Sequence, residues 1–391
     1  MSTSVPASSP MPSAPAFDVI VAGLGAMGST TLAQLARRGL RVAGFDRFAP
    51  PHALGSSHGR SRIIREAYYE DPRYVPLVQR AYAAWAELEA QSGAALLRRT
   101  GGVCYGPPDG TLVTGARRSA ETHGLPHEIL DADGLRRAYP VLRPDPSWIG
   151  VVEPRAGMLA PERCSAAALA VAERAGATVR RDEAVTGWHP DGDGVRVETG
   201  QGTYRAARLV LSTGAWMRET LGDLHLPLVV QRNVLYWFAP ARDAGAFAPE
   251  RFPVFLGDLG DGTMWYGFPD TGDGVKVAMH HHGPTTSPEG VDRTVAEDEV
   301  AAMRGRLARY LPAANGPLRE TATCLYTNTP DGHFVLDRHP AAPQVVLASP
   351  CSGHGFKFAS AMGEVLADLA MDRPPAFDLS LFTVGRFAAR V

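Results

Sequence analysis

The sequence predicts an α/β protein of two domains: a discontinuous domain with a parallel sheet, and an α+β domain built on an antiparallel sheet. Three observations support this. The 391 residues exceed the size of one comfortable hydrophobic core. The chain begins with strand, glycine-rich turn, helix and strand. Residues 96–151 and 231–321 are rich in Gly, Pro and aromatic residues, with alternating runs typical of antiparallel strands.

The first strand is expected at residues 18–24 (DVIVAGL), a short apolar and β-branched run. Residues 29–38 follow with apolar side chains at helical spacing, and Gly39 ends the helix. A second apolar run at residues 42–45 ends in Asp46. Together these segments predict one βαβ unit.

The same alternation of helices and strands returns twice further along. The segments are a helix at 161–175, strands at 177–181, 195–198 and 204–211, a strand at 344–348, a loop at 349–355 and a helix at 358–371.

These segments define the expected domains. The first domain takes residues 17–95, 152–230 and 322–391, and the second domain takes residues 96–151 and 231–321. The second domain is thus inserted twice into the first.

Composition excludes several classes of protein. Apolar residues make up 45% and charged residues 20%, as in ordinary globular proteins. Lys and Arg (39) nearly balance Asp and Glu (41), so no basic field exists to hold a nucleic acid. No apolar run reaches the length of about 18 residues that a membrane span requires. We expect neither nucleic acid nor membrane as a partner.

The cysteines and the first residues indicate the compartment. Residues 1–16 are rich in Ser, Pro and Ala but lack the basic and apolar regions of a signal peptide, so we interpret them as a disordered tail. Four cysteines lie far apart, without a CxxC pair: Cys104, Cys164, Cys324 and Cys351. A soluble, cytoplasmic protein fits best.

Gly23, Gly25 and Gly28 form G-x-G-x-x-G directly after the first strand and at the beginning of the helix. These glycines permit a tight turn, a close approach of the backbone to a pyrophosphate and close packing of helix and strand. Asp46 lies 18 residues after Gly28, where its carboxylate can accept from a ribose hydroxyl. The alternative is a glycine-rich turn without a ligand. The motif predicts a Rossmann-type dinucleotide site without separating FAD from NAD.

Five further motifs are long and specific: Pro50-Pro51-His52 with residues 55–65 (GSSHGRSRIIR), 213–216 (TGAW), 266–269 (YGFP), 324–337 (CLYTNTPDGHFVLD) and 352–358 (SGHGFKF). Through them the sequence resembles the monomeric sarcosine oxidase and N-methyltryptophan oxidase family, from about residue 17 to residue 387. The resemblance implies FAD, a discontinuous FAD-binding domain, a substrate domain on an antiparallel sheet, and an imine product.

The resemblance also assigns residues to the cofactor. Cys324 stands where the family attaches the flavin covalently through a thioether, and Gly353 and Gly355 would lie beside the cofactor. From the residues alone, Cys324 reads as a small buried apolar side chain.

Arg65 and Lys357 match the pair that holds the substrate carboxylate in the family. A guanidinium offers a two-point fork and an ammonium offers a point charge. The alternative is a surface ion pair of Arg65 with Glu66 or Glu70, and a solvated Lys357. The glycine-rich loop around Lys357 favours the functional interpretation, because such loops approach ligands closely.

Lys276 aligns with a lysine that lies near the flavin in the family and promotes its reaction with oxygen. A preorganised cation stabilises the negative charge that develops on oxygen. By resemblance, the same cavity also contains His280, Arg62, Tyr266, Tyr326 and His354. The run His280-His281-His282 could suggest a metal site, but neighbouring residues on a strand point to opposite faces, so we expect no metal.

The expected function is FAD-dependent oxidation of a secondary, N-methyl or N-alkyl amino acid. Hydride transfer would give an imine that hydrolyses, and oxygen would be reduced to hydrogen peroxide. Positive charge in the pocket lowers the pKa of the bound amine and keeps it unprotonated. The resemblance implies a monomer.

Departures from the family pattern keep alternatives open. Pro350 and Cys351 replace a Gly and an aromatic residue, and Arg60 and Glu66 replace an acid and a histidine. The resemblance therefore does not identify sarcosine itself as the substrate. The alternatives are an oxidase of a cyclic amino acid such as pipecolate or proline, an FAD dehydrogenase with another electron acceptor, and a non-catalytic flavin-binding protein.

Overall fold

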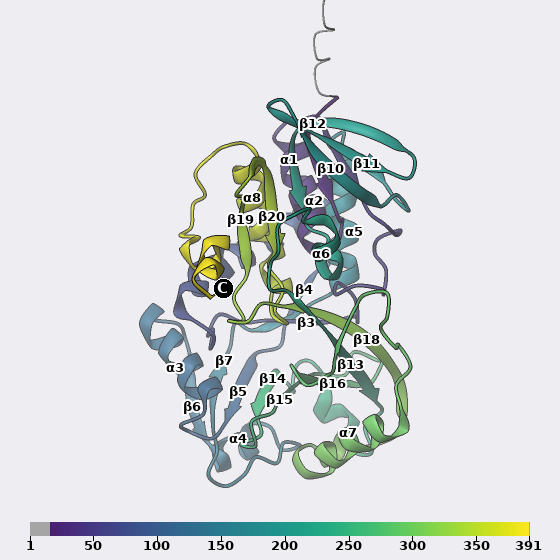
Figure 1. Ribbon diagram of the computed structural model, residues 1–391. Helices are drawn as coiled ribbons and strands as arrows, with labels where there is room; N and C mark the ends of the chain where they lie inside the picture. The colour runs from purple at the N-terminus through teal and green to yellow at the C-terminus, as the bar shows by residue number, and fades with distance from the viewer. Residues whose placement is uncertain (1–15, 391) are drawn as a thin grey trace, which may run out of the picture.

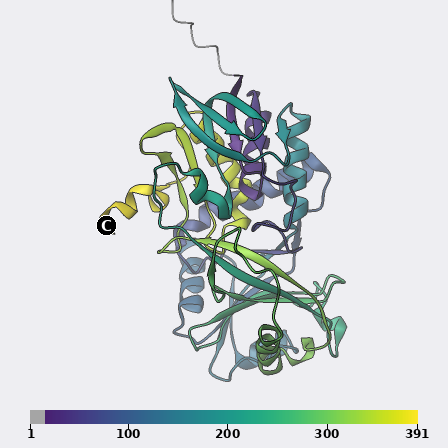
Figure 2. The same ribbon diagram turned by 45° about the vertical axis from the view of Figure 1, so that its right-hand side comes forward.

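The computed structural model describes residues 16–390 and has two halves (Figures 1 and 2). One half contains the first and last described segments, and the other contains the blue and green segments at the bottom of Figure 1. The tail expected at residues 1–16 lies, except for Ala16, outside the described residues. Within residues 16–390 no helix is both long enough and apolar enough to cross a membrane.

An eight-stranded sheet forms the first half. Its order is β10 (Val185–Asp191), β11 (Gly194–Thr199), β12 (Gly202–Leu211), β1 (Phe17–Ala22), β2 (Val42–Phe45) and β9 (Thr178–Arg180), with β20 (Ala342–Ser349) on β12 and β19 (Val335–His339) on β20. The pairs from β20 through β12, β1 and β2 to β9 are parallel. This sheet confirms the predicted class.

Four helices pack together in this half: α1 (Ala26–Arg37), α2 (Val75–Ser92), α5 (Pro161–Arg174) and α8 (Ala359–Ala370). Three of them were predicted, with ends displaced by at most three residues. Helix α2 was not predicted, and neither was β10, whose sequence VTGWHPD contains a glycine and a proline that weaken a strand pattern.

A nine-stranded sheet forms the second half. Its order is β17 (Thr285–Thr286), β13 (Val229–Phe238), β16 (Val275–His280), β15 (Met264–Phe268), β14 (Val254–Asp258), β5 (Gly102–Gly106), β7 (Ile149–Glu153) and β6 (Glu128–Asp131), with β18 (Leu318–Asn328) on β13. The sheet is antiparallel as predicted, apart from the parallel pair β5 and β14.

Strand β18 pairs with β13 along its whole length, from Leu318 to Asn328. Residues 322–328, which the sequence assigned to the nucleotide-binding domain, therefore lie in the second sheet. The pairing joins positions about 90 residues apart, which local patterns do not reveal. The domain boundaries stay a prediction.

The segments that the sequence predicted as sheet also contain helices: α3 (Thr111–His123), α4 (Ala132–Ala138) and α7 (Glu297–Tyr310). The remaining helical segments are short: α6 (Met217–Thr220), η1 (Pro72–Tyr74), η2 (Gly214–Trp216), η3 (Ala244–Phe247), η4 (Pro312–Ala314), η5 (Phe356–Phe358), η6 (Ser380–Phe382) and η7 (Val384–Arg390). A small sheet of β3 (Arg62–Ile64), β8 (Gly157–Leu159) and β4 (Leu97–Arg99) completes the fold.

Candidate active site

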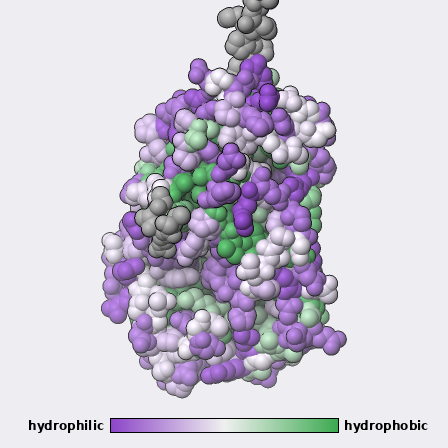
Figure 3. Space-filling view, in the orientation of Figure 1, coloured by the Kyte–Doolittle hydropathy of each residue, from purple (hydrophilic) through white to green (hydrophobic). Residues whose placement is uncertain are grey.

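A cavity lies where the two halves meet. Its wall includes Gly23 and Asp46, which directly follow β1 and β2 of the first sheet, Tyr266 and Cys324 from the second sheet, and Lys357 from η5. Hydrophobic atoms gather near the middle of the face in Figure 3, at the level of this junction. Residues from both ends of the chain and from its centre therefore face one space.

The glycine loop fits a dinucleotide. Gly23 has φ +86°, and a Cβ there would stand 2.5 Å from the carbonyl oxygen of Ser212. A Cβ on Gly28 would stand 1.8 Å from the carbonyl oxygen of Gly23. Gly25 is the N-cap of α1, without a side-chain cap and without an acid in the first turn. The positive end of the helix dipole is thus open to a phosphate, and the residues fit FAD.

Asp46 joins the end of β2 to the glycine loop. Its carboxylate accepts from the backbone N–H of Leu24 at 2.7 Å and from that of Phe48 at 2.9 Å. Carboxylate oxygens can accept more than one hydrogen bond, so Asp46 retains capacity for a ribose hydroxyl.

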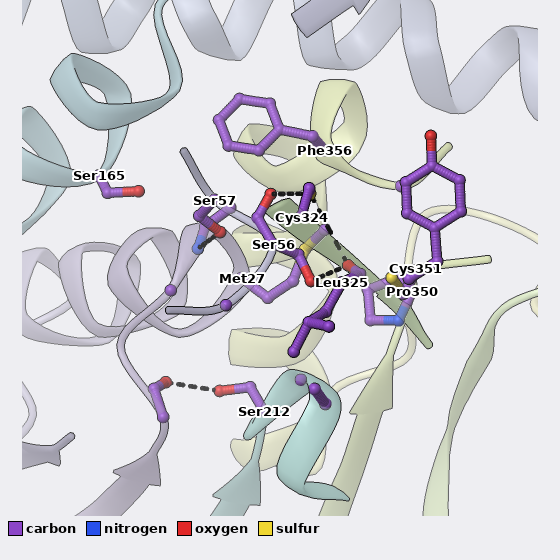
Figure 4. A pocket seen from close by; sticks show the side chains of 18 of the residues that line it. Met27, Ser56, Ser57, Ser165, Ser212, Cys324, Leu325, Pro350, Cys351 and Phe356 are labelled. Atoms are coloured by element: carbon purple, nitrogen blue, oxygen red, sulfur yellow. Dashed lines mark hydrogen bonds between the residues drawn. The ribbon is translucent and has the colours of Figure 1, made fainter. Parts of the chain in front are cut away.

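Cys324 lies on β18 and is 2% exposed. Nη2 of Arg62 lies 3.3 Å from its sulfur and also donates to the carbonyl oxygen of Ser56 at 2.8 Å. The Ser56 hydroxyl donates to the carbonyl oxygen of Leu325 at 2.5 Å. Figure 4 shows Ser56, Cys324 and Leu325 side by side. The loop before β3 is thus tied to β18 beside the thiol, with a positive charge against the sulfur.

Arg62 and Lys276 share one acceptor. The carbonyl oxygen of Ser61 accepts from Nζ of Lys276 at 2.8 Å and from Nη1 of Arg62 at 2.9 Å. Nζ of Lys276 also donates to the carbonyl oxygen of Gly59 at 2.7 Å. Arg62 lines the cavity, and Lys276 lies behind it, 1% exposed. Burial and the positive charge of Arg62 lower the pKa of Lys276 well below its ordinary value.

Arg65 and Lys357 lie on the wall of the same cavity and meet at Tyr68. The guanidinium carbon of Arg65 is 4.4 Å from the centre of the Tyr68 ring, and Nζ of Lys357 is 5.1 Å from it. Nζ of Lys357 donates to the carbonyl oxygen of His354 at 2.6 Å. Arg65 donates through Nη2 to both carboxylate oxygens of Glu70.

The cluster formed by Arg65, Glu70 and Lys357 carries charge despite its burial. Burial lowers the pKa of Lys357 to about 7, and the neighbouring Arg65 acts in the same direction. Burial alone would raise the pKa of Glu70, but Arg65, His354 and Lys357 outweigh burial and lower it. The sequence named Glu70 only as a surface ion-pair partner. Glu70 lies five residues after Arg65, a spacing that matches neither helical nor strand periodicity. The sequence therefore did not show that Glu70 lies at the cavity.

His354 is fixed by two partners. The Tyr68 hydroxyl lies 2.5 Å from Nδ1, and the carbonyl oxygen of Gly332 lies 2.9 Å from Nε2. A carbonyl can only accept, so we assign the proton to Nε2, and Nδ1 accepts from the hydroxyl. Burial lowers the pKa of His354 to about 4, which keeps the ring neutral.

Tyr266, Tyr326 and His280 form an aromatic wall. The Tyr326 hydroxyl lies 3.5 Å from Nδ1 of His280, and the rings of Tyr266 and His280 meet edge to face. Burial raises the pKa of both tyrosines and lowers the pKa of His280, so the wall is neutral. The rings of His281 and His280 also meet edge to face, with their centres 4.1 Å apart. In the part of the chain that the structure describes, no group of three His, Cys, Asp or Glu side chains could hold a metal.

The loop before Lys357 packs on Tyr326. A Cβ on Gly353 (φ +74°) would stand 2.5 Å from the Tyr326 ring, and one on Gly355 would stand 1.6 Å from the carbonyl oxygen of Pro350. Cys351, which departs from the family pattern, accepts through its sulfur from the N–H of Thr327 at 3.3 Å. These contacts attach the loop to β18.

Several cavity residues escaped the sequence analysis because their side chains are not chemically distinctive. They are Met27, Phe48, Ser165, Ala184, Val185 and Leu256, whereas Phe356 was included only as part of the motif at residues 352–358. Ser57 was recognised only as part of a motif, and its hydroxyl oxygen accepts from the N–H of Ala26 at 3.0 Å.

Comparisons with known proteins agree with this geometry. A sequence profile of the family described as "FAD dependent oxidoreductase" matches residues 18–369. A monomeric sarcosine oxidase from Streptomyces avermitilis is 45% identical over 379 residues, 96% of this chain and 99% of the relative. An N-methyl-L-tryptophan oxidase from Salmonella arizonae is 36% identical over 375 residues, 95% and 99% of the two chains.

The solved structure of NikD, an unusual amino acid oxidase essential for nikkomycin biosynthesis, superposes in its open form with a TM-score of 0.83. It is 25% identical and covers 94% of this chain and 97% of that chain. An L-proline dehydrogenase from P. horikoshii, 21% identical, shares the fold with a TM-score of 0.82 over 95% of this chain and 98% of its own. The resemblance indicated by the motifs is confirmed.

Proposed function

Because the chain belongs to the family of FAD-dependent oxidoreductases, we propose that it oxidises the carbon–nitrogen bond of a secondary, N-methyl or N-alkyl amino acid. One observation carries the proposal: Arg65 and Lys357 lie on the wall of the cavity that begins at the glycine loop. Two cations at one end of a flavin cavity suit the carboxylate of an amino acid. The names of the two relatives support an N-methylated amine.

FAD, when bound, supplies an acceptor for the hydride on the carbon next to the amine nitrogen. The open amino terminus of α1 at Gly25 would hold the pyrophosphate, and Asp46 would accept from a ribose hydroxyl. Gly353 and Gly355 allow the neighbouring loop to pack closely on Tyr326 and Pro350.

Arg65 and Lys357 would bind the substrate carboxylate and so orient the amine within the cavity. The cations Arg65, Lys357 and Arg62 disfavour a protonated amine, which lowers the pKa of the bound substrate. Tyr266, Tyr326 and the neutral His280 would exclude water from the reacting carbon. The imine that leaves the site hydrolyses in water.

Cys324 is the proposed point of covalent attachment. Its support is the position of the sulfur on the cavity wall, 3.3 Å from Nη2 of Arg62. Arg62 holds the sulfur at the wall of the cavity in which the flavin would bind.

Oxygen is the proposed electron acceptor, with hydrogen peroxide as product. The support is the guanidinium of Arg62 on the cavity wall, with Lys276 directly behind it, because fixed positive charge stabilises the negative charge that develops on oxygen. We also propose a monomer, as in the name of the Streptomyces relative, and a cytoplasmic location. The four free cysteines support the location.

The test is anaerobic mixing of the yellow protein with a panel of N-methyl and cyclic amino acids, followed by peroxide detection in air. N-methyl amino acids should bleach the flavin absorbance, and air should restore it with peroxide release. Faster bleaching by cyclic substrates would change the substrate class, and bleaching without peroxide would indicate another acceptor. A protein that no amine bleaches is not an amine oxidase.

A further inference from the structure

The loop that holds Lys276 has an unusual backbone. Gly59 and Arg60 are consecutive residues in the left-handed region, with φ +94° and +64°. This conformation is costly for a residue with a side chain, and it persists only where the surroundings impose it. It turns the carbonyl oxygens of Gly59 and Ser61 towards Nζ of Lys276, at 2.7 and 2.8 Å.

Glu162 supplies the constraint from a distant element. It lies in the first turn of α5, directly after Pro161, and is half-buried. Its Oε1 accepts from the N–H of Gly59 at 2.6 Å and from the N–H of Arg60 at 3.0 Å. One carboxylate oxygen therefore holds the two amides of the left-handed pair.

Glu162 also supplies charge. Arg62 and Lys276 share the Ser61 carbonyl, and each repels the other in a buried site. The negative charge of Glu162 favours the charged forms of Arg62 and Lys276. The carboxylate therefore offsets part of the repulsion while its oxygen holds the backbone.

We propose that Glu162 is a positioning residue for Arg62 and Lys276: it fixes the left-handed turn at Gly59 and Arg60, and its charge balances Arg62 on the wall of the flavin cavity and Lys276 behind that wall. The part that concerns reaction with oxygen rests on the function proposed above. The proposed effect of Glu162 on the backbone at residues 59 and 60 does not depend on that function.

Two variants of the holoenzyme separate the roles. Glu162→Gln keeps an oxygen at the position of Oε1 but removes the charge, whereas Glu162→Ala removes both. Glu297→Ala is the matched control, because Glu297 is an exposed acid in the first turn of α7. Hydrogen exchange of the amides of residues 59 and 60, thermal unfolding and the flavin reduction potential are measured for each variant.

Glu162→Ala should lower amide protection at residues 59 and 60 by about tenfold or more, the effect of losing a hydrogen bond to a charged group. It should also slow oxidation of the reduced flavin by oxygen by about tenfold, while anaerobic reduction by substrate changes less. Glu162→Gln should keep the protection, and its flavin potential should rise because a negative charge is gone. Glu297→Ala should change none of these.

Unchanged amide protection in Glu162→Ala would overturn the proposal, and so would equal losses in the Gln and Ala variants. Normal oxygen reactivity in Glu162→Ala, despite lost protection, would overturn the link to the cations. If the parent protein shows no amine oxidation, the proposed function fails, and the exchange measurement still decides the role of Glu162.

Discussion

Arg65 and Glu70 form an ion pair inside the cavity wall, in which the single nitrogen Nη2 lies 3.1 and 2.8 Å from the two carboxylate oxygens. Their side chains are 6% and 13% exposed. The cation proposed for the substrate carboxylate therefore already has a carboxylate partner, and a bound substrate shares Arg65 with Glu70 or displaces it.

Glu70→Gln should strengthen the binding of a simple carboxylate such as acetate. The change removes a negative charge from the site, and close buried charges couple by about 1.5 kcal/mol or more, so the dissociation constant should fall about tenfold. Titration of the flavin absorbance with acetate measures this. Glu87→Gln, which removes an exposed partner of Arg80, is the control. Weaker acetate binding in Glu70→Gln would mean that Glu70 orients Arg65 more than it competes with the ligand.

Carboxylate binding should weaken as the pH rises above about 7. The free protein holds the pKa of Lys357 at about 7, so its ammonium is charged below that pH and neutral above it. A bound carboxylate favours the charged form and raises the pKa, so the affinity is highest below pH 7 and declines between the free and bound pKa values. Acetate titrations from pH 6 to pH 9 measure the decline. Lys357→Met should abolish it, and a decline that survives in this variant would assign the titration to another group.

Cys324→Ala should keep the fold and release its flavin into the supernatant on acid precipitation. The side chain is small, so its loss from the core should cost only about 1 kcal/mol of unfolding free energy. Absorbance of pellet and supernatant locates the flavin, and circular dichroism checks the fold. Cys164→Ala, which changes a buried cysteine in α5, should keep the flavin in the pellet. Flavin that stays on the Cys324→Ala chain would place the attachment elsewhere.

Gly28→Ala should prevent flavin retention, because its methyl group would stand 1.8 Å from the carbonyl oxygen of Gly23 and displace the turn from α1. The flavin content per chain after purification measures this. Gly305→Ala is a matched change in the middle of α7, where a Cβ meets no atom within 4 Å. It should raise the unfolding free energy by about 0.5–1 kcal/mol and keep the flavin. A Gly28→Ala protein with full flavin content would show that the loop can relax.

The elements that the sequence predicted well are those with local signals. Strand β2 has the predicted bounds, and α5 begins at Pro161 as predicted, because an apolar run and a proline in the first turn act on nearby residues. β18 could not be assigned to its sheet in the same way. Its partner β13 lies far away in the sequence, and strand pairing depends on which faces become buried together.

The sequence by itself determined the βαβ unit, the glycine loop and, through its motifs, the family, because turn chemistry and side-chain periodicity reside in neighbouring residues. Only the tertiary structure brought Arg65 and Lys357 to one tyrosine ring, buried Glu70 beside them and set Glu162 against the loop that holds Lys276. These contacts join segments separated by five to nearly three hundred residues. Lys357 reaches Arg65 because η5 packs against β3, and Glu162 reaches Gly59 from α5, so local patterns do not encode these contacts.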